Sequence, residues 1–142
     1  MSPRLQRAQR ALDRAERRER EAKTAVMQAN QAVSECSGRI ARAQHSGAHL
    51  GTLDLPLELR ARYSQIGAHH LTALNQERGE LREIAAQKRS QWDATRVAAK
   101  SFAKLVERIR HNEREERRRS DAAELLDIVG ARSAQTANRS TP

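Results

Sequence analysis

Hydrophobic residues recur along the first third of the chain in two rows, each with a spacing of seven residues. The first row is mostly large and branched: Leu5, Leu12, Glu19, Val26, Val33 and Ile40. The second row begins three residues later and is almost all alanine: Ala8, Ala15, Ala22, Ala29, Cys36 and Ala43. Alternating steps of three and four residues place both rows on one narrow stripe of an α-helix. Because a stripe this narrow is buried only against another helix, the pattern predicts a coiled coil of closely spaced helices.

The ends of this pattern predict where the first helix begins and stops. Ser2 and Pro3 are typical of an N-cap and a first helical residue. The first helix is therefore expected over residues 3–44. The stretch 45–56, which contains two glycines and ends at a proline, predicts a bend.

A second helix is expected over residues 57–129. Its apolar positions are Leu59, Tyr63, Ile66, His70, Leu74, Leu81, Ile84, Trp92, Phe102, Leu105 and Ile109. Gly130 is expected to end this helix. Residues 131–142 are rich in Ser, Thr, Ala and Asn, so they are expected to form a disordered tail.

The two helices are unequal in length. At a rise of 1.5 Å per residue, the first would be roughly 60 Å long and the second roughly 105 Å. We therefore predict an all-α fold over residues 1–130, a long antiparallel two-helix coiled-coil hairpin whose second helix overhangs the first. Leu5 would lie opposite residues 95–99. The overhang would carry an apolar stripe without a partner: Phe102, Leu105, Val106, Ile109, Leu125 and Leu126. The stripe is expected to bind a partner, with self-association or a shifted register as the alternatives.

Composition supports an elongated helical protein with basic surfaces. The 142 residues include one Trp, one Tyr and one Phe, too few large side chains for a globular core. The net charge of +9 is compatible with nucleic acid, an anionic membrane surface or an acidic protein as partner. The single cysteine, Cys36, falls on the helical seam and is expected to be a small buried residue, with a reactive thiol as the alternative. With no secretory signal or apolar span expected, a cytoplasmic protein is predicted.

The sequence contains no motif that predicts catalysis. Gly47 and Gly51 are not followed by the Lys and Ser/Thr of a phosphate-binding loop. A two-helix rod offers no pocket where a nucleophile, a base and an oxyanion donor could converge. We therefore expect no enzyme activity and no cofactor. Four histidines lie around the bend, but a glycine inside the four-residue spacing of His45 and His49 argues against a metal site.

The second helix carries a distinctive order of residues. Trp92 is followed by a second aromatic residue, a leucine, a Glu-Arg pair, a mixed Glu/Arg run and a final Leu-Asp: Phe102, Leu105, Glu107-Arg108, Glu113 to Arg119 and Leu126-Asp127. In this order the chain resembles the FliJ/YscO-type stalk proteins of flagellar and injectisome type III secretion. These are small, basic two-helix coiled coils of about this length. The family's usual Asp-Glu pair near the end is Asp127-Ile128 here.

The resemblance implies a shaft-like part of a protein export machine. Its terminal end would enter the pore of the hexameric export ATPase, and the expected ATPase-binding residues are Leu5, Leu12, Phe102, Leu105, Arg108, Ile109, Arg114, Arg117, Arg118, Leu125 and Leu126. The expected export-gate-binding residues, with ordinary seam packing as the alternative, are Tyr63, Ile66, His70 and Leu74. Tyr63 and His70 are expected to be exposed. Arginines 110, 114 and 117–119 would contact the pore weakly or remain solvated.

The partners implied are the hexameric export ATPase, an export-gate membrane protein and secretion chaperones. The protein would then act at the cytoplasmic face of the inner membrane and reach it only through these partners. The resemblance covers flagellar and injectisome systems alike, and the short bend and arginine-rich composition favour an injectisome.

Two other functions compete with this interpretation. A nucleic-acid-binding hairpin is suggested by six arginines near one helical face: Arg4, Arg7, Arg10, Arg14, Arg17 and Arg18. Interleaved acids and the lack of aromatic stacking platforms argue against it, so no nucleic acid is expected. The third possibility is a generic coiled-coil scaffold or chaperone.

Overall fold

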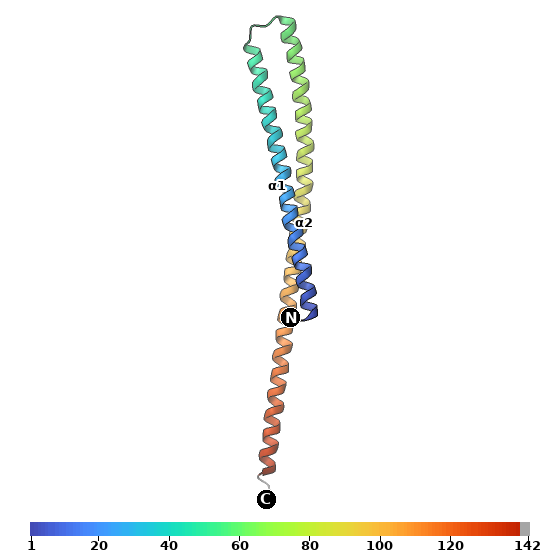
Figure 1. Cartoon of the computed structure of the whole chain (residues 1–142), viewed down its shortest axis with the longest axis vertical. Helices are drawn as coiled ribbons and strands as arrows, with labels where there is room; N and C mark the ends of the chain where they lie inside the picture. Colours follow the sequence, from blue (N-terminus) through green and yellow to red (C-terminus); the bar gives the residue numbers. More distant parts are fainter. Residues whose placement is uncertain (140–142) are drawn as a thin grey trace. The chain divides into compact units, whose positions relative to one another are not determined.

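The computed structural model describes residues 1–139, and it consists of two long helices joined by a short connection (Figure 1). Helix α1 is Pro3–Thr52 and helix α2 is Leu57–Arg139. No strand occurs within residues 1–139. Apolar residues of α1 pack against apolar residues of α2. The predicted all-α helical hairpin is therefore confirmed.

Helix α1 begins where the sequence predicts. The Leu5 amide donates a hydrogen bond to the Ser2 hydroxyl at 3.0 Å, which is the N-cap interaction that satisfies a free amide of the first turn. The Ser2 carbonyl accepts from the Gln6 amide at 2.9 Å. The Ser2 hydroxyl also donates to the carboxylate of Glu113 on α2. Ser2 therefore both caps α1 and ties its first turn to α2.

The predicted end of the first helix at residue 44 is wrong, because α1 continues to Thr52. No glycine within residues 1–139 has a positive φ, so Gly47 and Gly51 fit the helix. Extending an existing helix adds a hydrogen bond for each residue fixed, whereas nucleation is the costly step. The helix stops close to Pro56, whose ring disfavours helical geometry in the residue before it.

The connection is shorter than the predicted bend of residues 45–56 and comprises Leu53 to Pro56. The Thr52 hydroxyl donates to the His49 carbonyl at 2.7 Å as α1 ends. The Arg60 guanidinium donates to the Leu53 carbonyl at 3.1 Å, and the Arg60 amide donates to the Pro56 carbonyl at 3.0 Å. Arg60 thus holds the connection against the first turn of α2.

Helix α2 begins at Leu57 as predicted, but its predicted end at residue 129 is wrong. It continues through Gly130 to Arg139. Ala131, Ala134 and Ala137 favour a helix, and one glycine costs only about 1 kcal/mol. The disordered tail predicted for residues 131–142 is therefore helical as far as Arg139, and the remainder lies outside the described residues.

The chain divides into two compact units. The first, called the hairpin unit here, is Ala15–Ala98 and contains the connection. Its core consists of Cys36, Ile40 and Leu74, with Ala43, Leu71 and Leu81 packed against them. The Cys36 thiol is fully buried and donates to the Leu74 carbonyl at 3.5 Å. The expectation that Cys36 is a small buried seam residue is confirmed.

The second unit, called the terminal unit here, combines Met1–Arg14 with the chain from Ala99 onward. Its core consists of Leu5, Ala8, Leu12, Val106 and Ile109, with Phe102 and Ala103 packed against it. The predicted position of Leu5, opposite residues 95–99, is therefore wrong. The prediction placed His45 to Thr52 in the bend, and their inclusion in α1 shifts the pairing along α2.

The last part of α2 has no cover. Every residue from Glu116 to Arg139 is exposed. The predicted overhang is thus present within the terminal unit, but it begins later than expected. Phe102, Val106 and Ile109, predicted to be without a partner, pack against the first turns of α1 instead.

Candidate functional site

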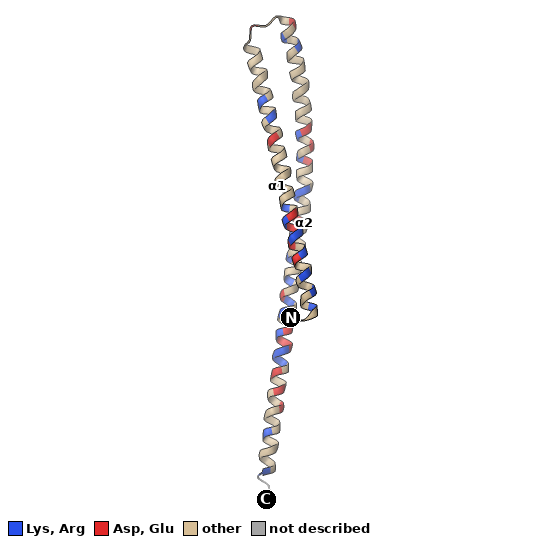
Figure 2. Cartoon of the chain, viewed as in Figure 1, with Lys and Arg blue, Asp and Glu red and all other residues tan. Residues whose placement is uncertain are grey.

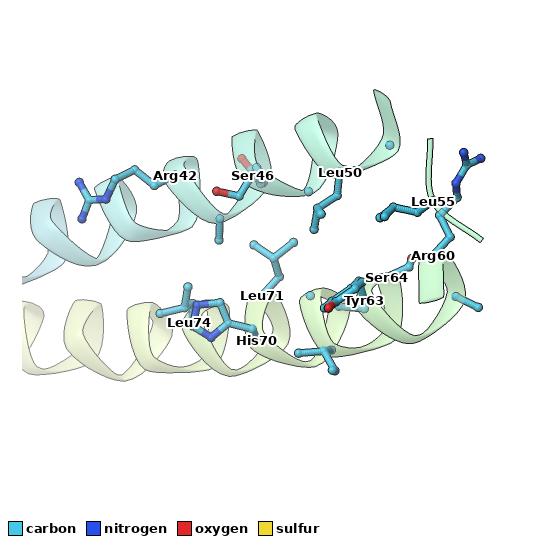
Figure 3. Close-up of a pocket in the computed structure, with 18 of the residues that line it drawn as sticks. Arg42, Ser46, Leu50, Leu55, Arg60, Tyr63, Ser64, His70, Leu71 and Leu74 are labelled. Atoms are coloured by element: carbon cyan, nitrogen blue, oxygen red, sulfur yellow. The ribbon is translucent and has the colours of Figure 1, made fainter. Parts of the chain in front are cut away.

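A groove lies between the end of α1 and the beginning of α2, and it is called the apical groove here. It is open to solvent, and its volume is about 1160 Å³. The residues that line it lie between Arg39 and Leu74, all within the hairpin unit. Leu50 on α1 and Leu71 on α2 point into the space between the helices (Figure 3). The wall of the groove is therefore largely apolar.

Small residues keep the apical groove open. Its lining includes Ala43, Ser46, Gly47, Gly51, Ala61, Ser64, Gly67 and Ala68. A Cβ atom added at Gly47, Gly51 or Gly67 would meet nothing within 4 Å. These glycines are therefore not required by close packing within the chain, and they leave room for atoms from outside it.

The charged side chains of the apical groove are all basic. The groove is lined by Arg39, Arg42 and Arg60, and no Asp or Glu lines it among the described residues. Arg39 forms an ion pair with Glu77 at 2.9 Å, whose hydrogen bond and negative charge raise the pKa of the guanidinium. Arg42 and Arg60 form no ion pair within residues 1–139. Arg42 is thus available to an acidic ligand, as are the N–H groups of Arg60 that do not bond to the Leu53 carbonyl.

All four predicted gate-binding residues line the apical groove: Tyr63, Ile66, His70 and Leu74. The predicted exposure of Tyr63 and His70 is confirmed. Ile66 is also exposed, whereas Leu74 belongs to the core of the hairpin unit. Sequence reasoning found one wall of this groove but missed the other, because it placed residues 45–52 in a bend rather than in a helix.

The predicted ATPase-binding residues are divided between a core and a surface. Leu5, Leu12 and Ile109 are buried and Phe102 is partly buried, all in the core of the terminal unit. The remaining residues are exposed: Leu105, Arg108, Arg114, Arg117, Arg118, Leu125 and Leu126. The structure therefore leaves Leu105, Arg108 and the later part of the predicted tip free to contact a partner.

The exposed end of α2 contains a second candidate surface, called the acidic segment here, residues 121–130. Its apolar side chains stand largely in solvent, with Leu125 63% and Leu126 73% exposed. Ile128 and Val129 are also exposed. The segment includes Asp121, Glu124 and Asp127 but no Lys or Arg. Sequence reasoning assigned only the two leucines to a binding surface, although the spacing of Ile128 and Val129 extends the same apolar stripe.

The arginines before the acidic segment are partly neutralised by neighbouring acids. Arg110 contacts Glu107 at 3.3 Å and donates to the Gln9 side chain at 3.3 Å. Arg118 contacts Glu115 at 3.3 Å. Basic and acidic residues are interspersed in several stretches of both helices, and other stretches carry no charged residue (Figure 2). Of the five arginines predicted to contact the pore weakly or remain solvated, Arg114, Arg117 and Arg119 form no ion pair within the described residues.

Trp92, the first residue of the family-like motif, lies in the hairpin unit. It is partly buried, and the Arg96 guanidinium lies over its ring at 5.1 Å from the centroid, as in a cation–π contact. The indole Nε1 is buried without a hydrogen-bond partner among the described residues.

The six arginines of the nucleic-acid hypothesis, Arg4 to Arg18, are all exposed.

The histidines do not form a recognisable metal site. His45 and His49 lie on the regular helix α1, so the argument from Gly47 against helical spacing was wrong. Nevertheless, residues 1–139 contain no group of three or more His, Cys, Asp or Glu side chains suited to hold a metal ion. In the same range, neither helix has a stretch long and apolar enough to cross a membrane.

Comparison with protein-family models, curated proteins and solved structures finds no match to this chain.

Proposed function

We propose that this protein is a stalk component of a type III protein export apparatus, inserting the exposed end of α2 into the hexameric export ATPase. The observation that carries the proposal is the continuous helical segment from Glu116 to Arg139, exposed along its whole length. A helix without a partner of its own can enter a pore without first dissociating from the rest of the chain. The order of residues from Trp92 to Asp127 adds the resemblance to stalk proteins.

The pore contact would combine exposed apolar side chains with weak charged contacts. Leu125 and Leu126 supply apolar area, and Arg114 and Arg117 supply cations. Exposed ion pairs contribute only about 0–1 kcal/mol each. A ring of such contacts would hold the helix in the pore without fixing one rotational position, as a stalk requires.

The proposal also assigns the apical groove to the export gate. Tyr63, Ile66 and His70 are exposed along one wall of the groove, where a membrane-anchored partner could reach them. Secretion chaperones are further candidate partners. The protein would then act at the cytoplasmic face of the inner membrane and stay there through these contacts.

The test is to add the purified chain to the export ATPase of its own organism. We expect faster ATP hydrolysis or hexamer assembly. Leu125→Asp combined with Leu126→Asp should abolish the stimulation, because both side chains are exposed and their change leaves the cores intact. The matched control is Met27→Asp, an equally exposed apolar residue on α1. Equal stimulation by the tip variant and the control would refute the pore assignment.

The competing nucleic-acid function is favoured by the exposed arginines Arg4, Arg7, Arg10 and Arg14. Binding to phosphates weakens steeply as the salt concentration rises. If the chain is retained on duplex or single-stranded DNA at about 150 mM salt and Arg7→Glu removes the retention, the nucleic-acid function replaces the stalk function. A chain that binds neither DNA nor ATPase would favour a generic scaffold.

A further inference from the structure

The same chain carries two exposed apolar surfaces of opposite charge. The apical groove has an apolar wall and a basic rim, on which Arg42 and Arg60 form no ion pair within residues 1–139. Arg60 donates to the Leu53 carbonyl, which leaves its other N–H groups for a carboxylate. The acidic segment has four exposed large apolar side chains and three carboxylates, and it contains no Lys or Arg. We infer that the acidic segment of one molecule binds in the apical groove of a second copy. This inference goes beyond the proposed function.

The dimensions of the two surfaces agree. The α1 wall of the groove runs from Arg39 to Gly51, about 18 Å at 1.5 Å per residue. The ten residues 121–130 make a helix of about 15 Å. The groove volume of 1160 Å³ is above the range of about 300–1,000 Å³ typical of small-molecule sites. It therefore suits a row of Leu, Ile and Val side chains.

The glycines of the groove fit a helical occupant. Gly47, Gly51 and Gly67 lie inside helices, where glycine is less favourable than alanine, and none is required by a contact in the chain. Without a Cβ, each allows a second helix to approach the backbone closely. Docking of a third helix against α1 and α2 would cover the apolar side chains of Leu50, Leu71 and Ile66.

The basic rim of the groove favours the acidic segment as its occupant over other parts of the chain, because the charges are opposite. Arg42 and Arg60 would face the carboxylates of Asp121, Glu124 and Asp127, and each such hydrogen-bonded pair is stronger than a neutral one. Helix α2 carries one wall of the groove and also the acidic segment. The occupant is the acidic segment of a second molecule.

The contact is heterologous, because the groove of one copy meets the tail of the next. Such a contact leaves a free groove and a free tail in every pair, so assembly continues as an open chain. Assembly would occupy the two surfaces that the proposed function assigns to the gate and the ATPase. Self-association would then keep the protein inactive, and binding of the ATPase or the gate would dissociate the assembly.

The test uses two full-length variants that each lose one side of the contact. Gly67→Glu places a bulky anion in the groove, and Leu125→Asp combined with Leu126→Asp removes the apolar face of the tail. Sedimentation velocity over about 1–300 μM should show association of the unaltered chain, and each variant alone should be monomeric. Because each variant keeps the surface that the other lacks, their mixture should form a 1:1 complex and nothing larger.

The matched control is Gly79→Glu, the same change on the same helix at a glycine that also has open space but does not line the groove. It should associate like the unaltered chain. Equal weakening by Gly67→Glu and Gly79→Glu, a monomeric unaltered chain, or a mixture without a complex would each overturn the inference. Circular dichroism reports whether each variant keeps its helices.

A charge-reversal pair keeps the inference testable if Gly67→Glu unfolds. Asp127→Lys and Arg42→Glu should each weaken association at least about tenfold, and the chain carrying both changes should regain it. Failure of the double variant to associate more tightly than either single variant would also overturn the inference. These measurements use no ATPase, so their outcome is independent of the stalk proposal.

Discussion

Arg39 on α1 and Glu77 on α2 form an ion pair at 2.9 Å that joins the two helices of the hairpin unit. The pair lies beside the core of Cys36, Ile40 and Leu74. The other ion pairs within the described residues join neighbouring turns of α2. Because the two side chains can pair only when these turns of α1 and α2 face each other, the ion pair favours the observed register.

Reversal of either charge in this pair should lower the melting temperature of the protein. Arg39→Glu places two carboxylates opposite each other, and Glu77→Arg places two guanidinium groups together. The chain that carries both changes should recover most of the loss, because the exchanged pair restores the attraction. Thermal unfolding followed by circular dichroism measures all three variants.

The control for this prediction is the pair of Glu115 and Arg118, which joins two turns of one helix. Its reversal should change the melting temperature less than reversal at Arg39 or Glu77. If the two sets of reversals have equal effects, the cross-helix pair does not contribute to the register.

The Cys36 thiol should react slowly with thiol reagents in the folded protein. Its side chain has no exposed surface, and its sulfur donates to the Leu74 carbonyl at 3.5 Å, so reaction requires local opening of the helices. We expect labelling at least about tenfold slower than in denaturant. The comparison protein is Cys36→Ala with Ser34→Cys, whose exposed thiol should react at the same rate with and without denaturant. Rapid labelling of native Cys36 would contradict its burial.

The heptad rows were sufficient to predict the architecture of the protein. The seven-residue spacing of Leu5, Leu12 and Ile40 identified residues that are buried in the structure. The N-cap at Ser2 and the start of α2 at Leu57 were also predicted correctly. These features depend on local sequence, and local sequence determines which face of a helix is apolar and how a helix begins.

The ends of the helices and the pairing between them could not be predicted in this way. Gly47 and Gly130 were taken as helix breaks, yet both lie within helices. A glycine weakens a helix by a modest amount that its neighbours can offset, so its presence does not determine where the helix ends. Because the first helix was predicted to end before Gly47, the expected pairing of the helices was shifted. The apical groove was not predicted for the same reason, since its α1 wall includes this glycine.

Replacement of the groove glycines by alanine should stabilise the hairpin unit. The added methyl group meets no atom within 4 Å at Gly47 or Gly67, and neither position has a positive φ. Each change should raise the free energy of unfolding by about 0.5–1 kcal/mol, since alanine loses less backbone entropy in a helix. Urea unfolding of both single variants measures the gain. A loss of stability at either site would mean that its glycine makes a contact in solution that the structure lacks.

The two ends of the apolar stripe on α2 should respond very differently to the same substitution. Ile109 is buried against Leu5 and Ala8 in the terminal unit, whereas Leu126 is 73% exposed. Ile109→Ala should lower the free energy of unfolding by about 2 kcal/mol. This is near the lower limit for a buried isoleucine, because two helices can move together and close part of the cavity. Leu126→Ala should change the free energy of unfolding by less than about 0.5 kcal/mol.

This comparison also tests the correction to the predicted register. If residues 95–99 rather than Ile109 lay opposite Leu5, Ile109→Ala would be as mild as Leu126→Ala. The same urea titration should then be repeated with Leu5→Ala, which removes the other side of the contact. Since Leu5 and Ile109 share one core, the double variant should lose less free energy of unfolding than the two single variants lose together. Full additivity would show that the two side chains do not pack together.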